Sequence, residues 1–214
     1  MPELSTLGNL RISGLYVIID PAACRTHGPV ETARMALEGG ARVIQWRDKR
    51  RDKGEQLDDA RAIVTLCREH GAAFIENDHA DFAVAVGADG VHLGQKDLPI
   101  ALVRPIAGAA MIIGVSTNNA AEARAAEAAG ADYVAVGAIF ATASKEVTRP
   151  ANIERLREVK AAVSVPVVAI GGIDAGNIAS VAAAGADAAA VISAVCGADD
   201  PRAAAARLAA AFAR

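Results

Sequence analysis

The sequence predicts a single-domain (β/α)8 barrel, the TIM barrel fold, on three observations. The chain has 214 residues, a length typical of one α/β domain. Short apolar segments rich in Val and Ile alternate with longer segments of helical character, without a break in composition. The fragment Gly-Ala-Asp, or Gly-Ala-Arg, recurs ahead of several of the apolar segments, as in an internal repeat of strand–helix units. A closed barrel is favoured over a doubly wound open sheet, because closure removes exposed strand edges.

The expected strands are short and apolar on both faces, as in parallel sheets that helices cover. They span Leu15–Asp20, Val43–Arg47, Ala73–Glu76, Gly90–Leu93, Ile112–Val115, Tyr133–Val136, Val167–Ile170 and Ala188–Ile192. Many of the expected helices end at glycine, which accepts the left-handed cap conformation. They span Val30–Glu38, Glu55–His70, Ala80–Val86, Ile100–Ala107, Asn119–Ala129, Ile153–Ala162, Ala175–Ala184 and Pro201–Ala213. We expect residues 1–13 to form a flexible N-terminal segment and residues 14–214 to form the barrel.

Composition and charge favour an enzyme that acts on small molecules. The net charge of −3 and the aromatic content of 3% argue against binding to nucleic acid or to an anionic membrane. The three cysteines are far apart and show no metal-binding spacing, which is typical of free thiols in the cytoplasm. We therefore expect a cytoplasmic protein whose partners are small phosphorylated substrates, and a homo-oligomer is compatible with the sequence.

The residues that follow each strand matter most, because the chemistry of such barrels lies at the carboxyl ends of the strands. The second strand runs into Gln45-Trp46-Arg47-Asp48-Lys49. Strand alternation puts Gln45, Arg47 and Lys49 on one side. Arg and Lys suit phosphate oxygens, although the same run also fits a solvated charged loop.

Two aspartates follow the third and fourth strands. Asp78 comes after Asn77, and Asp97 lies 19 positions further along the chain, which is one strand–helix repeat. Two carboxylates at one rim suit Mg²⁺, which takes oxygen ligands and shares its shell with substrate phosphates. The alternative for each aspartate is a role as the N-cap of the following helix, which would not exclude a metal role.

The later strand ends offer hydroxyl and amide groups. Ser116 follows the fifth strand and is placed to bind substrate, whereas Thr117 or Asn118 is expected to cap the next helix. The long connection from Gly137 to Asn152 has Thr142-Ala143-Ser144-Lys145 at its centre. A connection of this length and composition is expected to bind a phosphate group or to act as a lid over the substrate. Gly171-Gly172 and Ile192-Ser193 follow the last two strands, where phosphate sites recur in this fold, although tight turns also explain the glycines. His92, inside the fourth strand, fits a core histidine better than a catalyst.

Taken together, these segments resemble the thiamine phosphate synthase family, also called thiamine-phosphate pyrophosphorylase. The likeness runs in order through IQWRDK, ENDHADFAVAVGADGVHLGQKDLP, IGVSTNN, GADYVAVGAIFATASK, VPVVAIGGI and VISAV. The GADGVHLGQKDLP segment is the most specific, whereas AIGGI occurs in many phosphate-binding barrels. The family joins 4-amino-2-methyl-5-hydroxymethylpyrimidine diphosphate to a thiazole phosphate, and releases pyrophosphate and thiamine phosphate.

The resemblance implies a role for each matching residue. Pyrimidine diphosphate would be bound by Gln45, Trp46, Arg47, Asp48, Lys49, Asn77, Ser116 and Lys145. Thiazole phosphate would be bound by Thr142, Ala143, Ser144, Gly172, Ile192 and Ser193. Asp78 and Asp97 would bind Mg²⁺, and the catalytic groups would be those of Arg47, Lys49, Lys145 and Ser116.

The resemblance also implies a dissociative substitution at the pyrimidine methylene, assisted by Mg²⁺. Three different functions remain compatible with the barrel. A thiazole tautomerase of the sister branch would have a histidine at the position of Asn118 and degraded metal residues. A non-catalytic phosphate-ligand sensor would need no Mg²⁺ carboxylates, and a sugar-phosphate isomerase or epimerase would need a clear acid/base pair.

Overall fold

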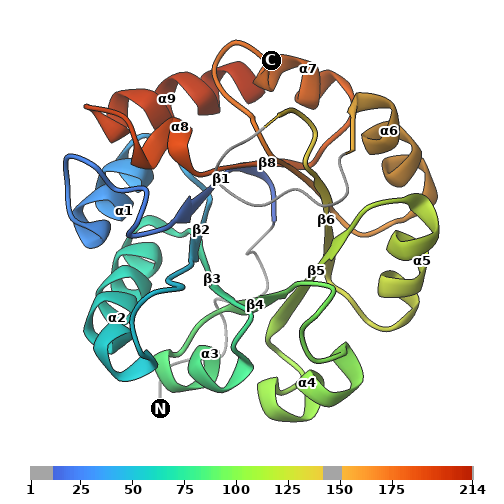
Figure 1. The fold of residues 1–214 in the computed structure, drawn as a ribbon, viewed down its shortest axis with the longest axis horizontal. Coiled ribbons are helices and arrows are strands. Elements are labelled where there is room, and N and C mark those ends of the chain that lie inside the picture. The colour runs from blue at the N-terminus through green and yellow to red at the C-terminus, as the bar shows by residue number, and fades with distance from the viewer. Residues whose placement is uncertain (1–11, 142–150, 214) are drawn as a thin grey trace.

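The protein is a closed eight-stranded parallel barrel surrounded by helices, in a computed structural model that describes residues 12–141 and 151–213 (Figure 1). The strands are β1 (Gly14–Ile19), β2 (Val43–Trp46), β3 (Ala73–Asn77), β4 (Gly90–Leu93), β5 (Ile112–Thr117), β6 (Tyr133–Gly137), β7 (Val167–Ile170) and β8 (Ala188–Val191). Each pairs with its neighbours in chain order, and β8 pairs with β1. The predicted (β/α)8 barrel is confirmed, and the open sheet is not formed.

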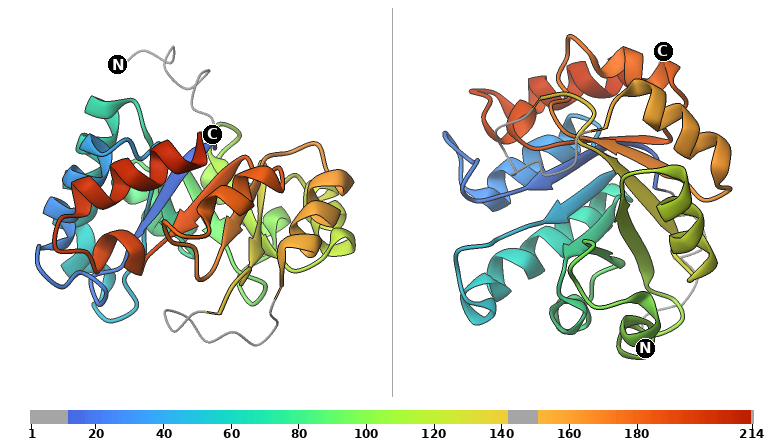
Figure 2. Two further views of the ribbon diagram at one scale, coloured as in Figure 1. Left: turned by 90° about the horizontal axis from the view of Figure 1, so that it is seen from above. Right: turned by 45° about the vertical axis from the view of Figure 1, so that its right-hand side comes forward.

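The helices follow the strands in the order expected. They are α1 (Pro29–Glu38), α2 (Lys53–His70), α3 (Ala80–Val86), α4 (Ile100–Ala107), α5 (Ala120–Ala128), α6 (Ile153–Ala162), α7 (Ile178–Ala183), α8 (Ser193–Cys196) and α9 (Pro201–Phe212). The last helix, α9, packs against α1 and completes the ring (Figures 1 and 2). Gly39 permits this approach, because a Cβ there would lie 2.6 Å from the Cβ of Ala205.

The strands sort their side chains between two apolar clusters. In β3, Ala73 and Ile75 belong to the cluster inside the barrel, whereas Phe74 belongs to the cluster between the barrel and the helices. This alternation follows from the two-residue period of a strand. Consequently, a polar residue at an inward position near the carboxyl end of a strand faces the mouth of the barrel.

The Gly-Ala-Asp repeat ties neighbouring strands together at their amino ends. Asp89, Asp132 and Asp187 each lie just before an even-numbered strand. Their carboxylates accept hydrogen bonds from the backbone amides of Phe74 (2.8 Å), Ile113 (2.8 Å) and Val167 (2.7 Å), respectively. Their own amides donate to the carbonyls of the same three residues. The repeat seen in the sequence is therefore a device for fixing strand register.

Several element boundaries differ from those expected. The short helix α8 was not predicted, because four residues show no periodicity. Asn119 caps α5 by accepting a hydrogen bond from the Glu122 amide, so the expected cap at Thr117 or Asn118 is wrong. β5 extends to Thr117 and therefore contains Ser116.

The N-terminal segment up to residue 11 lies outside the described residues. Ile12 belongs to the expected flexible stretch, and it is buried in the inner cluster. In the described part of the chain, no helix combines the length and apolar character that a membrane span requires.

Candidate functional site

Asp78 and Asp97 lie together at the carboxyl ends of β3 and β4. Asp78 adopts a left-handed backbone conformation (φ 69°), which aspartate tolerates better than most residues, and its amide donates to the His92 carbonyl at 2.8 Å. The Asp97 carboxylate accepts a hydrogen bond from the Gly94 amide at 2.6 Å. Neither aspartate is an N-cap, since α3 is preceded by His79 and α4 by Pro99.

The two carboxyl groups lie close enough to interact directly, so the ionisation of each one affects the pKa of the other. Burial favours the neutral form of both groups. It raises the pKa of Asp97, and the charge of Asp78 adds to this effect against the opposing Gly94 amide. For Asp78, the hydrogen bonds from Lys49 and Asp97 outweigh burial and lower the pKa. The pKa of Asp78 therefore lies below that of Asp97.

The carboxyl pair fits a hard divalent cation that shares its shell with substrate. Asp78 and Asp97 supply oxygen donors only, and both line a cleft of about 520 Å³ beside α3 and α4. Within the described residues, no group of three or more His, Cys, Asp or Glu side chains could hold a metal alone. Mg²⁺ is commonly bound by one or two carboxylates together with waters and phosphate oxygens, so the donor set suits it.

Two cationic side chains lie at the same end of the barrel, each with a carboxylate partner. Lys49 forms an ion pair with Asp78, and its side chain is 52% exposed. Arg47 forms an ion pair with Asp20, which directly follows β1. The sequence did not predict Asp20 as a site residue, although its position directly after a strand could have indicated one. The structure thus brings the loops after β1, β2 and β3 together through charge.

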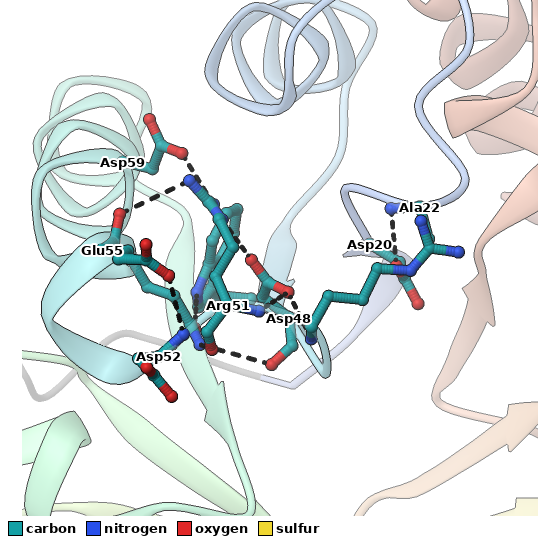
Figure 3. Close-up of polar contacts among 10 residues, drawn as sticks. Asp20, Ala22, Asp48, Arg51, Asp52, Glu55 and Asp59 are labelled. Carbon is teal, nitrogen blue, oxygen red and sulfur yellow. Dashed lines mark hydrogen bonds and ion pairs between the residues drawn. The ribbon is translucent and has the colours of Figure 1, made fainter.

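Trp46 belongs to the cluster between the barrel and the helices, and Asp48 lies beside Arg51 on the same side (Figure 3). The Asp48 carboxylate accepts hydrogen bonds from the Arg51 side chain (2.6 Å) and the Arg50 amide (2.9 Å). Trp46 is fully buried, and its indole N–H donates to Gln56 at 2.9 Å. Both side chains are therefore held by neighbouring parts of the protein, so substrate binding at these two positions would use their backbone groups.

Inside the mouth of the barrel, Gln45 and Ser116 are held by buried partners. The Gln45 amide nitrogen donates to the Tyr16 hydroxyl at 2.8 Å. The Ser116 hydroxyl lies 2.9 Å from His92 Nε2, so His92 is a satisfied core histidine that touches a predicted site residue. Asn77 ends β3 and lies in register with His92. Tyr16 was missed, because its partner becomes apparent only when the barrel closes.

The loop after β7 lies beside the residues that follow β6, since the Phe140 amide donates to the Gly171 carbonyl at 3.0 Å. Gly172 has φ 63°, and a Cβ there would lie 2.8 Å from the Cβ of Phe140, so only glycine fits without displacement. The Asn177 side chain donates to the Gly172 carbonyl at 2.9 Å. Ile192 is the N-cap of the short helix α8, and Ser193 is its first residue. Four further predicted residues, Thr142, Ala143, Ser144 and Lys145, lie outside the described residues.

Comparisons with known proteins agree over nearly the whole chain. The profile of the family described as thiamine monophosphate synthase matches residues 15–195. A thiamine-phosphate synthase from Moorella thermoacetica is 50% identical over 195 residues, covering 91% of this chain and 93% of the relative. One from Methanoculleus marisnigri is 50% identical, covering 89% and 91%.

Solved structures give the same result. The thiamine phosphate pyrophosphorylase from Pyrococcus furiosus superposes with a TM-score of 0.86 at 41% identity, covering 95% of this chain and 96% of that one. A 3-hexulose-6-phosphate synthase superposes with a TM-score of 0.68 at 22% identity, a likeness that shows the barrel fold alone.

Proposed function

This chain belongs to the thiamine monophosphate synthase family, and we infer from that membership that it is a thiamine-phosphate synthase, a transferase. It condenses 4-amino-2-methyl-5-hydroxymethylpyrimidine diphosphate with a thiazole phosphate. The products are thiamine phosphate and pyrophosphate.

The observation that best supports a metal-assisted reaction at this rim is that Asp78 and Asp97 line the same cleft, close enough for their carboxyl groups to interact. We propose that these two carboxylates hold Mg²⁺ together with the diphosphate of the pyrimidine substrate. When bound, Mg²⁺ would neutralise negative charge that grows on the departing pyrophosphate. Both substrates carry phosphate, which agrees with a site that combines cationic side chains and glycine turns.

The chain's own residues would bind, orient and neutralise. Arg47 and Lys49 would face the diphosphate. Lys145, which lies outside the described residues, would add a third cationic group. The carbon–oxygen bond at the pyrimidine methylene breaks, and its electron pair leaves with pyrophosphate. The lone pair of the thiazole nitrogen then forms the new carbon–nitrogen bond. Because that nitrogen carries no proton, no general base is required, and alignment of the two substrates is the main task.

The thiazole phosphate would lie at Gly172, Ile192 and Ser193, together with Thr142, Ala143 and Ser144. The support for this assignment is the family resemblance together with the position of Gly172, Ile192 and Ser193 after β7 and β8, where phosphate sites recur in such barrels.

The direct test is to incubate the purified protein with both substrates and Mg²⁺, and to assay for thiamine phosphate and pyrophosphate. We expect both products in equal amounts, and their loss when a chelator removes the metal. If the folded protein binds each substrate but releases no product, a phosphate-ligand sensor replaces the synthase.

A thiazole tautomerase and a sugar-phosphate isomerase both have less support than the synthase. The tautomerase would have a histidine at position 118, where this chain has Asn118, whose side chain donates to the Gly137 carbonyl at 3.4 Å. The relatives named above are synthases, and none of them is a sugar-phosphate isomerase.

A further inference from the structure

Five polar side chains from five strands form one hydrogen-bonded chain inside the barrel. Its order is Gln45 (β2), Tyr16 (β1), Tyr133 (β6), His92 (β4) and Ser116 (β5). The successive distances are 2.8 Å, 3.1 Å, 2.9 Å and 2.9 Å. We refer to these five side chains as the relay. Its two ends are the residues that the family resemblance assigns to the pyrimidine diphosphate, so any role of the relay in substrate choice rests on the proposed function.

The barrel leaves space for the central member of the relay. Gly114 lies in β5, opposite the start of β6, and a Cβ there would collide with the ring of Tyr133. The absence of a side chain at Gly114 lets Tyr133 lie across the interior, where its ring also stacks on His92 at 5.5 Å between centroids. Tyr133 is fully buried, so its hydroxyl must be satisfied by these neighbours.

The protons of the relay can be followed from one end. Burial raises the pKa of both Tyr16 and Tyr133, so each hydroxyl keeps its proton. The Tyr16 oxygen accepts a hydrogen bond from Gln45 Nε2, so the Tyr16 hydroxyl donates its own hydrogen bond to the Tyr133 oxygen. The Tyr133 hydroxyl in turn donates to His92 Nδ1. The imidazole proton of His92 is therefore on Nε2, which donates to the Ser116 oxygen.

The two ends of the relay consequently present opposite groups. The Ser116 oxygen accepts from His92, so its proton is available as a donor toward the mouth of the barrel. Gln45 uses its amide nitrogen on Tyr16, and no hydrogen bond among the described residues engages its carbonyl oxygen, which remains an acceptor. If the donor and acceptor roles were exchanged at one end only, a proton or a lone pair in the interior would have no partner. The hydrogen-bonding roles of Gln45 and Ser116 are therefore coupled.

We propose that Tyr16, Tyr133 and His92 are positioning residues that set the hydrogen-bond polarity of Gln45 and Ser116, and so select an aminopyrimidine. A 4-aminopyrimidine offers one donor, its amino group, beside one acceptor, its ring nitrogen. An acceptor at Gln45 and a donor at Ser116 complement that edge. The 4-oxo analogue offers the reverse pattern, a carbonyl oxygen beside a ring N–H, and meets a mismatch at both ends.

The test compares 4-aminopyrimidine diphosphate with its 4-oxo analogue in the wild type, Tyr133→Phe and Tyr16→Phe. Each substitution removes one hydroxyl and keeps the ring. We expect the ratio of kcat/KM values, amino over oxo, to fall about tenfold or more in both variants. The loss should come from a higher KM for the aminopyrimidine, with the KM for thiazole phosphate unchanged. Val168→Ala, a buried change in the inner cluster on β7, is the matched control and should lower stability without changing the ratio.

A folded Tyr133→Phe or Tyr16→Phe variant that keeps the wild-type ratio would overturn the proposal, and either variant suffices if the other does not fold. If the wild-type protein makes no thiamine phosphate, the proposed function fails by itself. Calorimetry with the two pyrimidine diphosphates then tests the relay separately. Equal binding of both compounds by the wild-type protein would overturn it.

Discussion

Lys49 and Asp78, which are 29 positions apart in the chain, form an ion pair where the ends of β2 and β3 meet. The contact joins a predicted diphosphate-binding cation to a predicted metal ligand. The positions of the Lys49 ammonium and the Asp78 carboxylate are therefore coupled at this rim. A substitution of either residue should alter the position and charge environment of the other.

Removal of the Asp78 carboxylate tests the metal site. Asp78→Ala should lower turnover by roughly 10²-fold or more and weaken the dependence on Mg²⁺. The reason is that the negative charge on the departing pyrophosphate would no longer be stabilised by a metal ion bound at Asp78. Steady-state rates across a Mg²⁺ titration measure both effects. Asp81→Asn is the matched control, since it removes an exposed carboxylate three residues away that pairs with Lys53. An Asp78→Ala enzyme with unchanged rate and metal dependence would refute the assignment.

Asp20 should control Arg47. Asp20→Asn removes the carboxylate that holds this guanidinium at the rim. We expect kcat/KM for the pyrimidine diphosphate to fall by roughly tenfold to 10²-fold, since misplacement of an orienting group costs about that much. Asp59→Asn takes a partner from Arg51 instead and should change the rate little. The prediction is wrong if the two variants behave alike.

Gly172 should be intolerant of a side chain. Gly172→Ala adds a Cβ that meets Phe140 at a backbone conformation with positive φ, so we expect a loss of about 1–3 kcal/mol in unfolding free energy. The KM for thiazole phosphate should rise more than that for the pyrimidine. Urea unfolding and steady-state kinetics provide the two measurements. Gly54→Ala, with no atom near its Cβ, serves as the control, and an equal response of both KM values would argue against a thiazole role.

Asp48 should make stability depend on pH. Burial opposes its ionisation, but hydrogen bonds from Arg51 and from two backbone amides lower the pKa of Asp48 in the folded chain. Its stabilising contribution is thus complete above the unfolded pKa of about 3.9 and is lost as pH falls through the folded value. Asp48→Asn should cost about 1–2 kcal/mol at pH 7 and progressively less toward pH 3.

Urea unfolding between those pH values measures the difference for Asp48. Asp58→Asn, an exposed carboxylate on α2, should show no such trend. A constant difference between wild type and Asp48→Asn over the whole range would contradict the assigned cause.

The fold could be predicted because its signals are local. Strand alternation, glycine caps and the Gly-Ala-Asp repeat each lie within a few residues of the element that they define. The aspartates after β3 and β4 could be placed at one rim for the same reason, since parallel strands point their carboxyl ends the same way. Family resemblance then supplied roles that the pattern alone left open.

Relationships across the barrel could not be predicted from the chain. Tyr16 and Tyr133 are 117 positions apart, and their hydroxyl contact exists only after closure. Trp46 was grouped with its neighbours in the binding segment, whereas strand alternation turns its side chain into the helix layer. The side chain of Asp48 is likewise retained by Arg51 rather than directed to the barrel mouth. The orientation of such side chains depends on which hydrogen-bond partners and apolar neighbours the folded structure brings close to them.

The aspartates of the Gly-Ala-Asp repeat lie at the opposite end of the strands from Asp78 and Asp97. Thermostability and substrate choice can therefore be engineered independently in this enzyme. Replacements at the floor of the barrel would change how firmly the strands are joined, and loop exchange at the mouth would change what is bound. A library built for a new pyrimidine should leave Asp89, Asp132 and Asp187 untouched, so that each variant begins from the same framework.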